Sequence, residues 1–539
     1  MSSTVHTGTT LQSTPRQRWT GLAVLVLAVT VVAVDATVLS LALPSISETL
    51  RPSGTQLLWI GDAYSFVLAG LLVSMGALSD RIGRKRLLLT GSAAFGAASL
   101  LAAYAPTSGW LILARALLGV AGATIMPSTL SLIRSLFPDH RERATAIGIW
   151  GAAATAGAAL GPVVGGVLLE HFWWGSVFLL NIPILVLLLV TGAWLLPESR
   201  DPKPGRWDVL SVVLSMAGVI GVVYAVKEAA AHGVARWDVP VTFLLGAAAL
   251  TLFVRRQLRL ETPLLDVRLF RDRRFTAAAL ASLISLIGLS GVVFVTSQYL
   301  QLVRGYEPLR AGLAELPAFV GSVVGGLLTA RLARRFGARS ALTSCLLAMG
   351  LGVGALGWIQ QDTTYLLLAA SFLLVGTAEG VVYTLGADLV LNAAPADKAG
   401  AASAVSETAY ELGTALGIAL VGSVVGSIYA SGLTVPAGTD PALAARAGES
   451  LGSAVETTQG LPPAVAEPLL ASARESFVHG MNSAGLLAAA LLTGAAVMAW
   501  RLLRRLPAQP AADPVPVPAP AAAPTAAPAA APAAEKLDA

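Results

Sequence analysis

The sequence predicts an all-α integral membrane protein whose chain crosses the bilayer fourteen times. Of its 539 residues, 55% are hydrophobic and only 12% are charged, whereas soluble chains carry about 25% charged residues. The mean hydropathy is +0.72. The apolar residues gather in long runs, and a helix needs about 20 mainly apolar residues to cross a bilayer. Composition and patterning together therefore place the chain in the membrane class.

Fourteen runs have the length and polarity of a spanning helix. The weakest two, 208–228 and 239–256, are separated by a charged turn that contains Lys227, Glu228 and Arg236. The predicted spans are 19–43, 57–78, 87–105, 110–133, 144–169, 174–196, 208–228, 239–256, 275–302, 311–333, 340–359, 364–392, 402–430 and 482–503.

Besides the shorter connecting loops, three stretches outside these spans have a distinctive composition. Residues 1–18 form a polar tail, and residues 431–479 form a long loop rich in Ala, Gly, Ser and Glu. Residues 507–539 are an Ala/Pro-rich tract. This tract has no side chains with which to build a core, so we expect it to be disordered.

The lysine and arginine residues orient the chain. If the N-terminus lies in the cytoplasm, the cytoplasmic loops and both termini hold most of them, as the positive-inside rule requires. The net charge of +5 then comes from a membrane-facing girdle of basic residues, not from one patch that could bind nucleic acid. We expect a multi-pass protein of the cytoplasmic membrane with both termini in the cytoplasm and no nucleic-acid partner.

Several chemical classes are excluded. Cys345 is the only cysteine, so no intramolecular disulfide or cysteine metal cluster is expected. The five histidines fall in tails or loops, and we expect no metal site and no cofactor. The sequence lacks a P-loop, so ATP is not expected to drive any process. These observations argue against an enzyme.

A short charged turn joins the second and third predicted spans. It reads Gly76-Ala77-Leu78-Ser79-Asp80-Arg81-Ile82-Gly83-Arg84-Lys85-Arg86. Asp80 can cap the start of the next helix or pair with an arginine, and Arg81 and Arg84 offer fork-shaped donors. The positive-inside bias alone explains the charges but not their order. The string resembles the loop signature of the major facilitator superfamily, with Gly76 and Gly83 at the two glycine positions.

A weak internal repeat supports this resemblance. The segment 326–339 echoes the charged turn but lacks its acid, and it joins the tenth and eleventh predicted spans. If the spans in 208–256 are an insertion, the two turns occupy matching places. The resemblance then implies a major-facilitator-type fold, in which 19–196 and 275–503 form two pseudo-symmetric six-helix bundles around a midplane site.

Small residues form a stripe along the fifth span, at Gly157, Gly161, Pro162, Gly165 and Gly166. Such residues let helices pack closely, and proline bends the backbone. Their spacing resembles the Gly-x-x-x-Gly-Pro-x-x-Gly-Gly motif of exporters and antiporters in the superfamily. Read as bare packing, the stripe indicates only a tight helix interface.

Asp35 interrupts the apolar run of the first span, and Arg115 interrupts that of the fourth. Asp35 lies roughly 13 Å from the outer end of its helix at Pro44. A carboxylate at this depth costs at least a few kcal/mol unless it is paired or protonated. We interpret Asp35 as a proton or cation site and Arg115 as its switchable partner. The alternative is a static ion pair that only ties two helices together.

Further acids lie in or near other spans. Glu407 and Glu411 are four residues apart and share one helix face. Two such neighbouring anions repel, so we expect one of them to hold a proton at rest, unless one faces headgroups or a loop. Glu379 is a third deep acid, and Asp62 stands near the outer start of the second span, where an exposed interfacial acid would explain it equally well.

Aromatic rings near these acids could bind a cation. The candidates are Trp59, Tyr64, Tyr299 and Tyr410. One departure from related multidrug pumps concerns the tenth span, where an aspartate often follows Leu-Pro. Here Ser322 stands near that position, after Leu316 and Pro317. This puts recognition of divalent organic cations in doubt.

These features, together with Asn181-Ile182-Pro183-Ile184, resemble the fourteen-helix drug:proton antiporter family, over roughly residues 19–503. The resemblance implies a monomeric secondary transporter that exports bulky, amphipathic, cationic drugs, antiseptics or dyes in exchange for protons, by alternating access. Two alternatives stay open. One is a dedicated exporter of an endogenous metabolite or antibiotic, and the other is a membrane sensor that transports nothing.

Overall fold

The computed structural model describes residues 14–52, 54–200, 208–232, 236–261, 263–361, 363–395, 398–436, 439–458 and 461–503. Most of the predicted N-terminal tail and all of the predicted tract 507–539 lie outside these residues. Every regular element in the described part is a helix.

The elements have the following bounds: α1 Pro15–Leu50, α2 Gly54–Ile82, α3 Arg84–Ala103, α4 Ser108–Leu136, α5 His140–His171, α6 Ser176–Leu179, α7 Asn181–Leu195, α8 Val209–His232, α9 Asp238–Arg259, η1 Val267–Arg271, α10 Arg273–Gln298, η2 Tyr299–Val303, α11 Pro308–Ala355, η3 Leu356–Trp358, α12 Tyr365–Ala393, α13 Ala399–Gly432, α14 Pro441–Glu449, α15 Leu451–Thr458 and α16 Pro463–Leu502.

The predicted all-α membrane fold with fourteen spans is confirmed. Thirteen stretches of the described residues are long and apolar enough to cross a bilayer. One of them covers 49 residues, Arg310–Trp358, and this stretch is broken at Gly337, where φ is 79° and ψ is 152°. A left-handed backbone favours glycine and interrupts the helix. The two parts of α11 are therefore two spans, which brings the number to fourteen.

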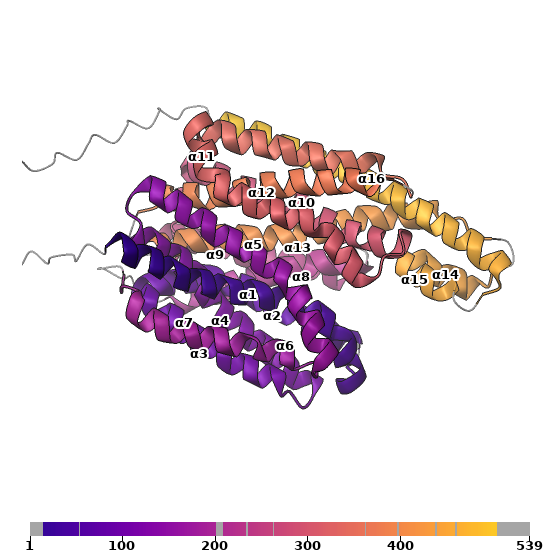
Figure 1. Ribbon diagram of the computed structural model, residues 1–539, viewed down its shortest axis with the longest axis horizontal. Helices are drawn as coiled ribbons and strands as arrows, with labels where there is room; N and C mark the ends of the chain where they lie inside the picture. The colour runs from indigo at the N-terminus through magenta and orange to yellow at the C-terminus, as the bar shows by residue number, and fades with distance from the viewer. Residues whose placement is uncertain are drawn as a thin grey trace, which may run out of the picture. The chain divides into compact units, whose positions relative to one another are not determined.

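Two groups of helices make up the bundle (Figure 1). In the first, α1 packs on α5 and α7, α2 packs on α4, and α3 packs on α4 and α7. In the second, α11 packs on α12 and α16, and α10 packs on α12, α13 and α16. The groups meet along two seams, α2 with α13 and α5 with α11 and α12. The second span of each group therefore packs on the fifth span of the other group.

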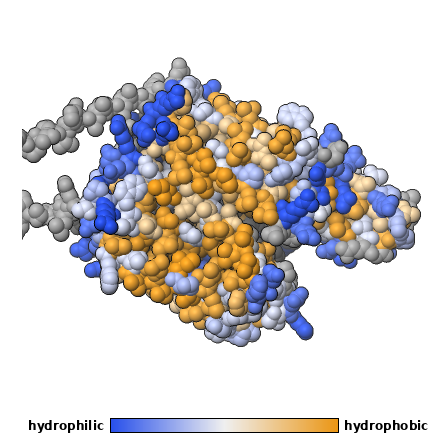
Figure 2. All heavy atoms as spheres, viewed as in Figure 1, coloured by the Kyte–Doolittle hydropathy of each residue, from blue (hydrophilic) through white to orange (hydrophobic). Residues whose placement is uncertain are grey.

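The inserted pair α8 and α9 packs beside one of the seams. Phe66 of α2 and Val219 and Val223 of α8 share a small apolar cluster, against which Leu412 of α13 packs. Helix α8 thus contacts both α2 and α13. Figure 2 shows a broad hydrophobic face over the described helices, as expected for a surface that faces lipid.

The pair α8 and α9 is joined by an ion pair at one end. Arg256 Nε donates to Asp208 Oδ2 over 2.7 Å, and Arg256 Nη2 donates to Asp208 Oδ1 over 3.1 Å. Asp208 also accepts from the hydroxyl of Ser211 over 2.6 Å. The hydrogen bonds from Arg256 lead the causes that lower the pKa of Asp208 to about 2.

The predicted long loop 431–479 is partly helical. It contains α14 and α15, and its last part belongs to α16, which begins at Pro463 instead of residue 482. Leu469, Ala473 and Phe477 are buried at helical spacing, so this extension is stabilised by packing along one face. The hydroxyl of Tyr429 donates to the carbonyl of Ala447 over 2.7 Å, which fastens α14 to α13.

Candidate functional site

Asp35 of α1 lies fully buried in a polar network of four helices. Its Oδ2 accepts from Arg115 Nη1 of α4 over 3.0 Å, and its Oδ1 accepts from Asn181 Nδ2 of α7 over 2.9 Å. Asn181 also donates to Ser99 Oγ of α3 over 3.1 Å. The pairing of Asp35 with Arg115 expected from the sequence is therefore present, and Asn181 completes it by binding the second carboxylate oxygen.

Tyr64 of α2 extends this network toward the other group of helices. The guanidinium of Arg115 lies 4.7 Å from the centre of the Tyr64 ring, close enough for a cation–π contact. The hydroxyl of Tyr64 is buried without a hydrogen-bond partner in the described part. Tyr64 belongs to α2, which packs on α13 of the other group.

Glu407 of α13 is a buried acid that contacts one ring of an aromatic cluster. Its exposed fraction is 1%, and its Oε1 accepts from the hydroxyl of Tyr383 of α12 over 3.4 Å. The Tyr383 ring stacks on Trp150 of α5, with ring centres 5.9 Å apart. It also meets Tyr410 edge-on, with ring centres 5.2 Å apart. A buried acid beside an aromatic cluster with rings from both groups is an arrangement that can bind an organic cation.

Glu379 of α12 lies one helical turn from Tyr383 and is also buried. Its Oε2 accepts from Ser322 Oγ of α11 over 3.1 Å. The hydroxyl of Ser322 is 3.2 Å from Thr155 Oγ1 of α5. The position at which related pumps often carry an aspartate is thus in contact with an acid from the neighbouring helix. Glu411 lies one helical turn from Glu407 on α13 and is half-buried.

Three other sequence-predicted site residues, Tyr299, Trp59 and Asp62, take no part in the contacts described above. Tyr299 is fully buried, and its hydroxyl donates to the carbonyl of Gln360 over 2.7 Å. Trp59 is 39% exposed, and its ring contacts Phe66 with ring centres 5.8 Å apart. Asp62 is half-buried, one turn of α2 beyond Trp59.

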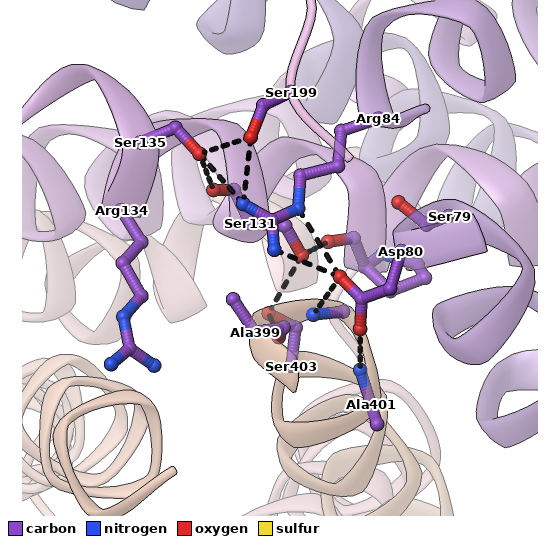
Figure 3. Close-up of polar contacts among 12 residues, drawn as sticks. Ser79, Asp80, Arg84, Ser131, Arg134, Ser135, Ser199, Ala399, Ala401 and Ser403 are labelled. Carbon is purple, nitrogen blue, oxygen red and sulfur yellow. Dashed lines mark hydrogen bonds and ion pairs between the residues drawn. The ribbon is translucent and has the colours of Figure 1, made fainter. Parts of the chain in front are cut away.

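A second polar cluster joins the two groups at the charged turn (Figure 3). Asp80 Oδ1 accepts from the backbone N–H of Gly400 over 3.0 Å, and Oδ2 accepts from that of Ala401 over 3.1 Å. Helix α13 begins at Ala399, and its own preceding residue, Lys398, supplies no side-chain cap. Asp80 of α2 therefore caps α13 from across the seam, where its charge is favoured by the helix dipole.

Arg84 holds Asp80 in place. Its Nη2 donates to Asp80 Oδ1 over 2.9 Å, while its Nη1 donates to Ser135 Oγ over 2.7 Å and to Ser199 Oγ over 3.1 Å. Figure 3 shows the guanidinium between these serines and the carboxylate. The other predicted donor, Arg81, has a buried Nη1 without a hydrogen-bond partner in the described part.

Two arginines of the first group bind the connection between α12 and α13 at the end of α12. Arg134 of α4 donates to the carbonyls of Leu391 and Ala394 at the end of α12. Arg143 of α5 donates to Asn392 Oδ1. Positive charge at a helix C-terminus is stabilising. The connection between α12 and α13 is thus held by arginines where one helix ends and by Asp80 where the next begins.

Glycine pairs permit close approach at both seams. A Cβ on Gly76 would lie 2.4 Å from the carbonyl oxygen of Gly400, and a Cβ on Gly148 of α5 would lie 2.5 Å from that of Gly326. Gly76 and Gly326 open the two echoing turns, so the repeat is also a repeat of packing. Gly83 has φ 112°, a backbone conformation that requires glycine.

The stripe on α5 packs against α1. A Cβ on Gly157 would lie 3.0 Å from Thr30 O, one on Gly161 would lie 2.0 Å from Thr37 Oγ1, and one on Gly165 would lie 2.6 Å from Val38 Cγ2. A Cβ on Gly166 would meet nothing within 4 Å. The side chain of Pro162 lies outside the described part. Three of the four glycines therefore serve the α1–α5 contact.

Sequence reasoning missed several residues of these clusters. Asn181, Tyr383 and Arg143 were assigned no role there, although each is a polar or aromatic side chain within or at the end of an apolar run. That signal singles out positions but not partners. Among the described residues, no group of histidine, cysteine or acidic side chains could hold a metal ion.

Comparison with known proteins gives consistent matches. Residues 25–418 match the family model described as Major Facilitator Superfamily. The multidrug efflux pump LfrA of Mycolicibacterium smegmatis is 47% identical over 505 residues, which cover 94% of this chain and 100% of the relative. The methyl viologen resistance protein SmvA of Salmonella typhimurium is 37% identical over 484 residues, which cover 90% of this chain and 98% of the relative.

A solved structure matches the fold. The crystal structure of the human organic anion transporter MFSD10 (TETRAN) superposes with a TM-score of 0.59 and 15% identity. The match covers 89% of this chain and 100% of that one. At this identity the likeness concerns the arrangement of the helices alone.

Proposed function

The chain belongs to the major facilitator superfamily of membrane transporters, and we propose that it exports bulky, amphipathic, cationic drugs or dyes in exchange for protons. Similarity to the multidrug efflux pump LfrA and to SmvA supports drug efflux. The observation that carries the proposal is the set of buried acids shared between the two groups of helices, from Asp35 to Glu379.

Proton coupling follows from the burial of these acids. Asp35 is fully buried and bound to Arg115 and Asn181. Protonation of Asp35 removes one charge of the pair and leaves Arg115 without its counter-ion, which favours rearrangement of α1 against α4. Each proton that crosses the membrane contributes about 2.3 kcal/mol per 100 mV of membrane potential.

Substrate binding is assigned to the acids of the second group and their rings. Glu407, Glu411 and Glu379 would supply counter-charge, and Tyr383, Trp150 and Tyr410 would supply aromatic surface. A cation over an aromatic face gains about 2 kcal/mol when desolvated. Because Trp150 belongs to α5 and Tyr383 to α12, movement between the groups would open and close this region.

We further propose that residues 19–196 and 275–503 move as two bundles, with the inserted helices within 208–256 beside one seam. We also propose that the protein lies in the cytoplasmic membrane, with both termini in the cytoplasm. The cap of Asp80 on α13 then closes the cytoplasmic end. Both bundles are present in one chain, so a monomer would be complete. Breaking the cap would shift the balance between inward- and outward-facing states without removing substrate contacts.

Everted membrane vesicles test this function. A panel of cationic, neutral and anionic fluorescent compounds is offered to energised vesicles, with and without a protonophore. Uptake of cationic compounds that the protonophore abolishes supports the proposal. Uptake confined to one neutral or anionic compound would contradict it in favour of a dedicated metabolite exporter. No uptake of any compound, with correctly inserted protein, would point to a membrane sensor.

A further inference from the structure

The second of the two echoing turns carries arginines that form no ion pair with the residues that the structure describes. In the first turn, Asp80 pairs with Arg84 over 2.9 Å. Counted from Gly76 and Gly326, Ala330, Arg331 and Arg334 stand at the positions of Asp80, Arg81 and Arg84, and the helix break at Gly337 comes four residues later in this count than the break at Gly83. Arg331, Arg334 and Arg335 are exposed, and none of them forms an ion pair in the described part of the chain.

The packing explains why the second turn has no acid. Helix α13 has no side-chain cap of its own and receives Asp80 from α2. Helix α5, its counterpart at the other seam, is capped by the preceding residue, Asp139, which accepts from the backbone N–H groups of Arg141 and Glu142 over 2.9 Å each. An acid at position 330 would have no helix start to cap, so the second turn keeps its arginines without an acid of its own.

We propose that the α11 arginine patch, formed by Arg331, Arg334, Arg335 and Arg339, binds the headgroup of an anionic phospholipid in the cytoplasmic leaflet. Figure 2 shows hydrophilic atoms at the bend of α11, next to the broad hydrophobic face. Basic residues attract anionic headgroups at this membrane depth, and each contributes roughly fivefold to affinity. The proposal goes beyond drug export and uses only the proposed orientation of the chain.

The helix face that leads to the patch fits an acyl chain. Val320, Val324 and Leu327 are 54%, 42% and 52% exposed, and their spacing puts them on one face of α11. Arg331 and Arg334 continue the same face at the next two turns. A lipid whose tail lies along the apolar part of this face would therefore place its phosphate beside two guanidinium groups.

Aromatic side chains complete the patch at the level of the headgroups. Arg339 lies 3.4 Å from the centre of the Trp500 ring and donates from Nε to the carbonyl of Trp500 over 3.1 Å, so its position is fixed. Phe336 is 56% exposed and Trp500 is 44% exposed. Aromatic residues gather at the membrane–water interface, and here they flank the arginines.

The test counts bound lipids on the purified full-length protein. Delipidated protein in detergent is titrated with phosphatidylglycerol or phosphatidylcholine, and bound lipids are counted by native mass spectrometry. We expect wild type to favour phosphatidylglycerol. The triple variant R331Q/R334Q/R335Q should bind phosphatidylglycerol roughly a hundredfold more weakly, and the matched lysine variant R331K/R334K/R335K should keep most of the affinity.

The control variant is R271Q/R273Q/R274Q. It removes the same charge from the other basic loop, where Asp266 and Asp272 stand nearby. This control should bind phosphatidylglycerol like wild type. Undiminished binding by R331Q/R334Q/R335Q would overturn the proposal, and so would an equal loss in both glutamine variants. These arginines would then serve only to orient the chain in the membrane. Both results are independent of transport, since neither a drug nor a proton gradient is present.

Discussion

Asp80 of α2 caps the first turn of α13 by accepting hydrogen bonds from the backbone N–H groups of Gly400 and Ala401. The acid and the helix that it caps are more than 300 residues apart and belong to different groups of helices. A cap of this kind is normally supplied by the residue just before the helix. Its supply from across the seam makes the start of α13 depend on whether the two groups are in contact.

Asp80→Asn should favour the state in which this seam is open. The substitution removes the charge that the α13 dipole and Arg84 stabilise, which shifts the equilibrium by about 1–2 kcal/mol. The substitution Ser403→Cys, in a Cys345→Ser background, places a single cysteine at this seam. We expect a maleimide to label this cysteine roughly 5–30 times faster when Asp80→Asn is also present. Rates of maleimide labelling in everted vesicles measure this effect.

Asp139→Asn is the matched control for that experiment. Asp139 also caps a helix start, but the helix is its own α5. We expect this variant to leave the labelling rate near the wild-type value. Equal acceleration in both variants would mean that loss of any helix cap loosens the bundle, and the seam would lose its special role.

Gly161→Ala should destabilise the protein. A Cβ on Gly161 would lie 2.0 Å from Thr37 Oγ1 and 3.1 Å from Val34 O, so α1 and α5 would have to separate. Overpacking of this kind costs about 1–3 kcal/mol. Gly166→Ala is the control, because its Cβ would meet nothing within 4 Å and alanine favours the helix. Thermal unfolding in detergent measures both. A lower midpoint for Gly166→Ala than for Gly161→Ala would contradict the packing.

Asp208→Asn should loosen the pair α8 and α9 at neutral pH. The pKa of Asp208 is lowered to about 2 from 3.8, so its contribution to stability is present above about pH 4 and is lost as the pH falls toward 2. Because the pair lies near the surface, the free energy of unfolding should fall by only about 0.5–1 kcal/mol at pH 7. Stability measured against pH should show the difference between variant and wild type shrinking in the acidic range. A difference that grows there would contradict the ion pair.

Glu407→Gln should weaken recognition of cations. The buried carboxylate accepts a hydrogen bond from Tyr383, whose ring meets Tyr410, and its replacement by an amide removes counter-charge while keeping the side-chain shape. We expect the KM for a cationic dye to rise about tenfold, with little change for a neutral compound. Glu456→Gln, on the exposed face of α15, is the control. Equal effects on the two compounds would assign Glu407 a structural role instead.

The sequence indicated the spans and the buried charges because both depend on composition alone. Apolar length locates a span, and an acid such as Asp35 inside it requires a partner. The pairing with Arg115 could be inferred because Arg115 is the only lysine or arginine that lies more than three residues from the ends of a predicted span. The bond from Asn181 to the other carboxylate oxygen could not, because a neutral amide costs less to bury and therefore stands out less.

The sequence could not predict the other partners that join distant segments. The glycine at position 76 indicates a close helix contact, but it does not identify the partner, Gly400. Ser322 stands where related pumps often carry an acid, and only the structure shows that Glu379 lies beside it. The extension of α16 was missed because residues 463–479 are too polar to read as a span, although their packing stabilises a helix. Partners of this kind depend on how helices cross, which no local pattern determines.

The central claim is that Asp35 exchanges the proton that drives export. The most direct test imposes a pH gradient across the membrane of proteoliposomes, adds a transported cationic dye and measures the movement of protons. Wild type should release protons in step with dye movement. Asp35→Asn should bind the dye but move no protons, because its amide cannot titrate. Proton movement of undiminished size in Asp35→Asn would contradict the account.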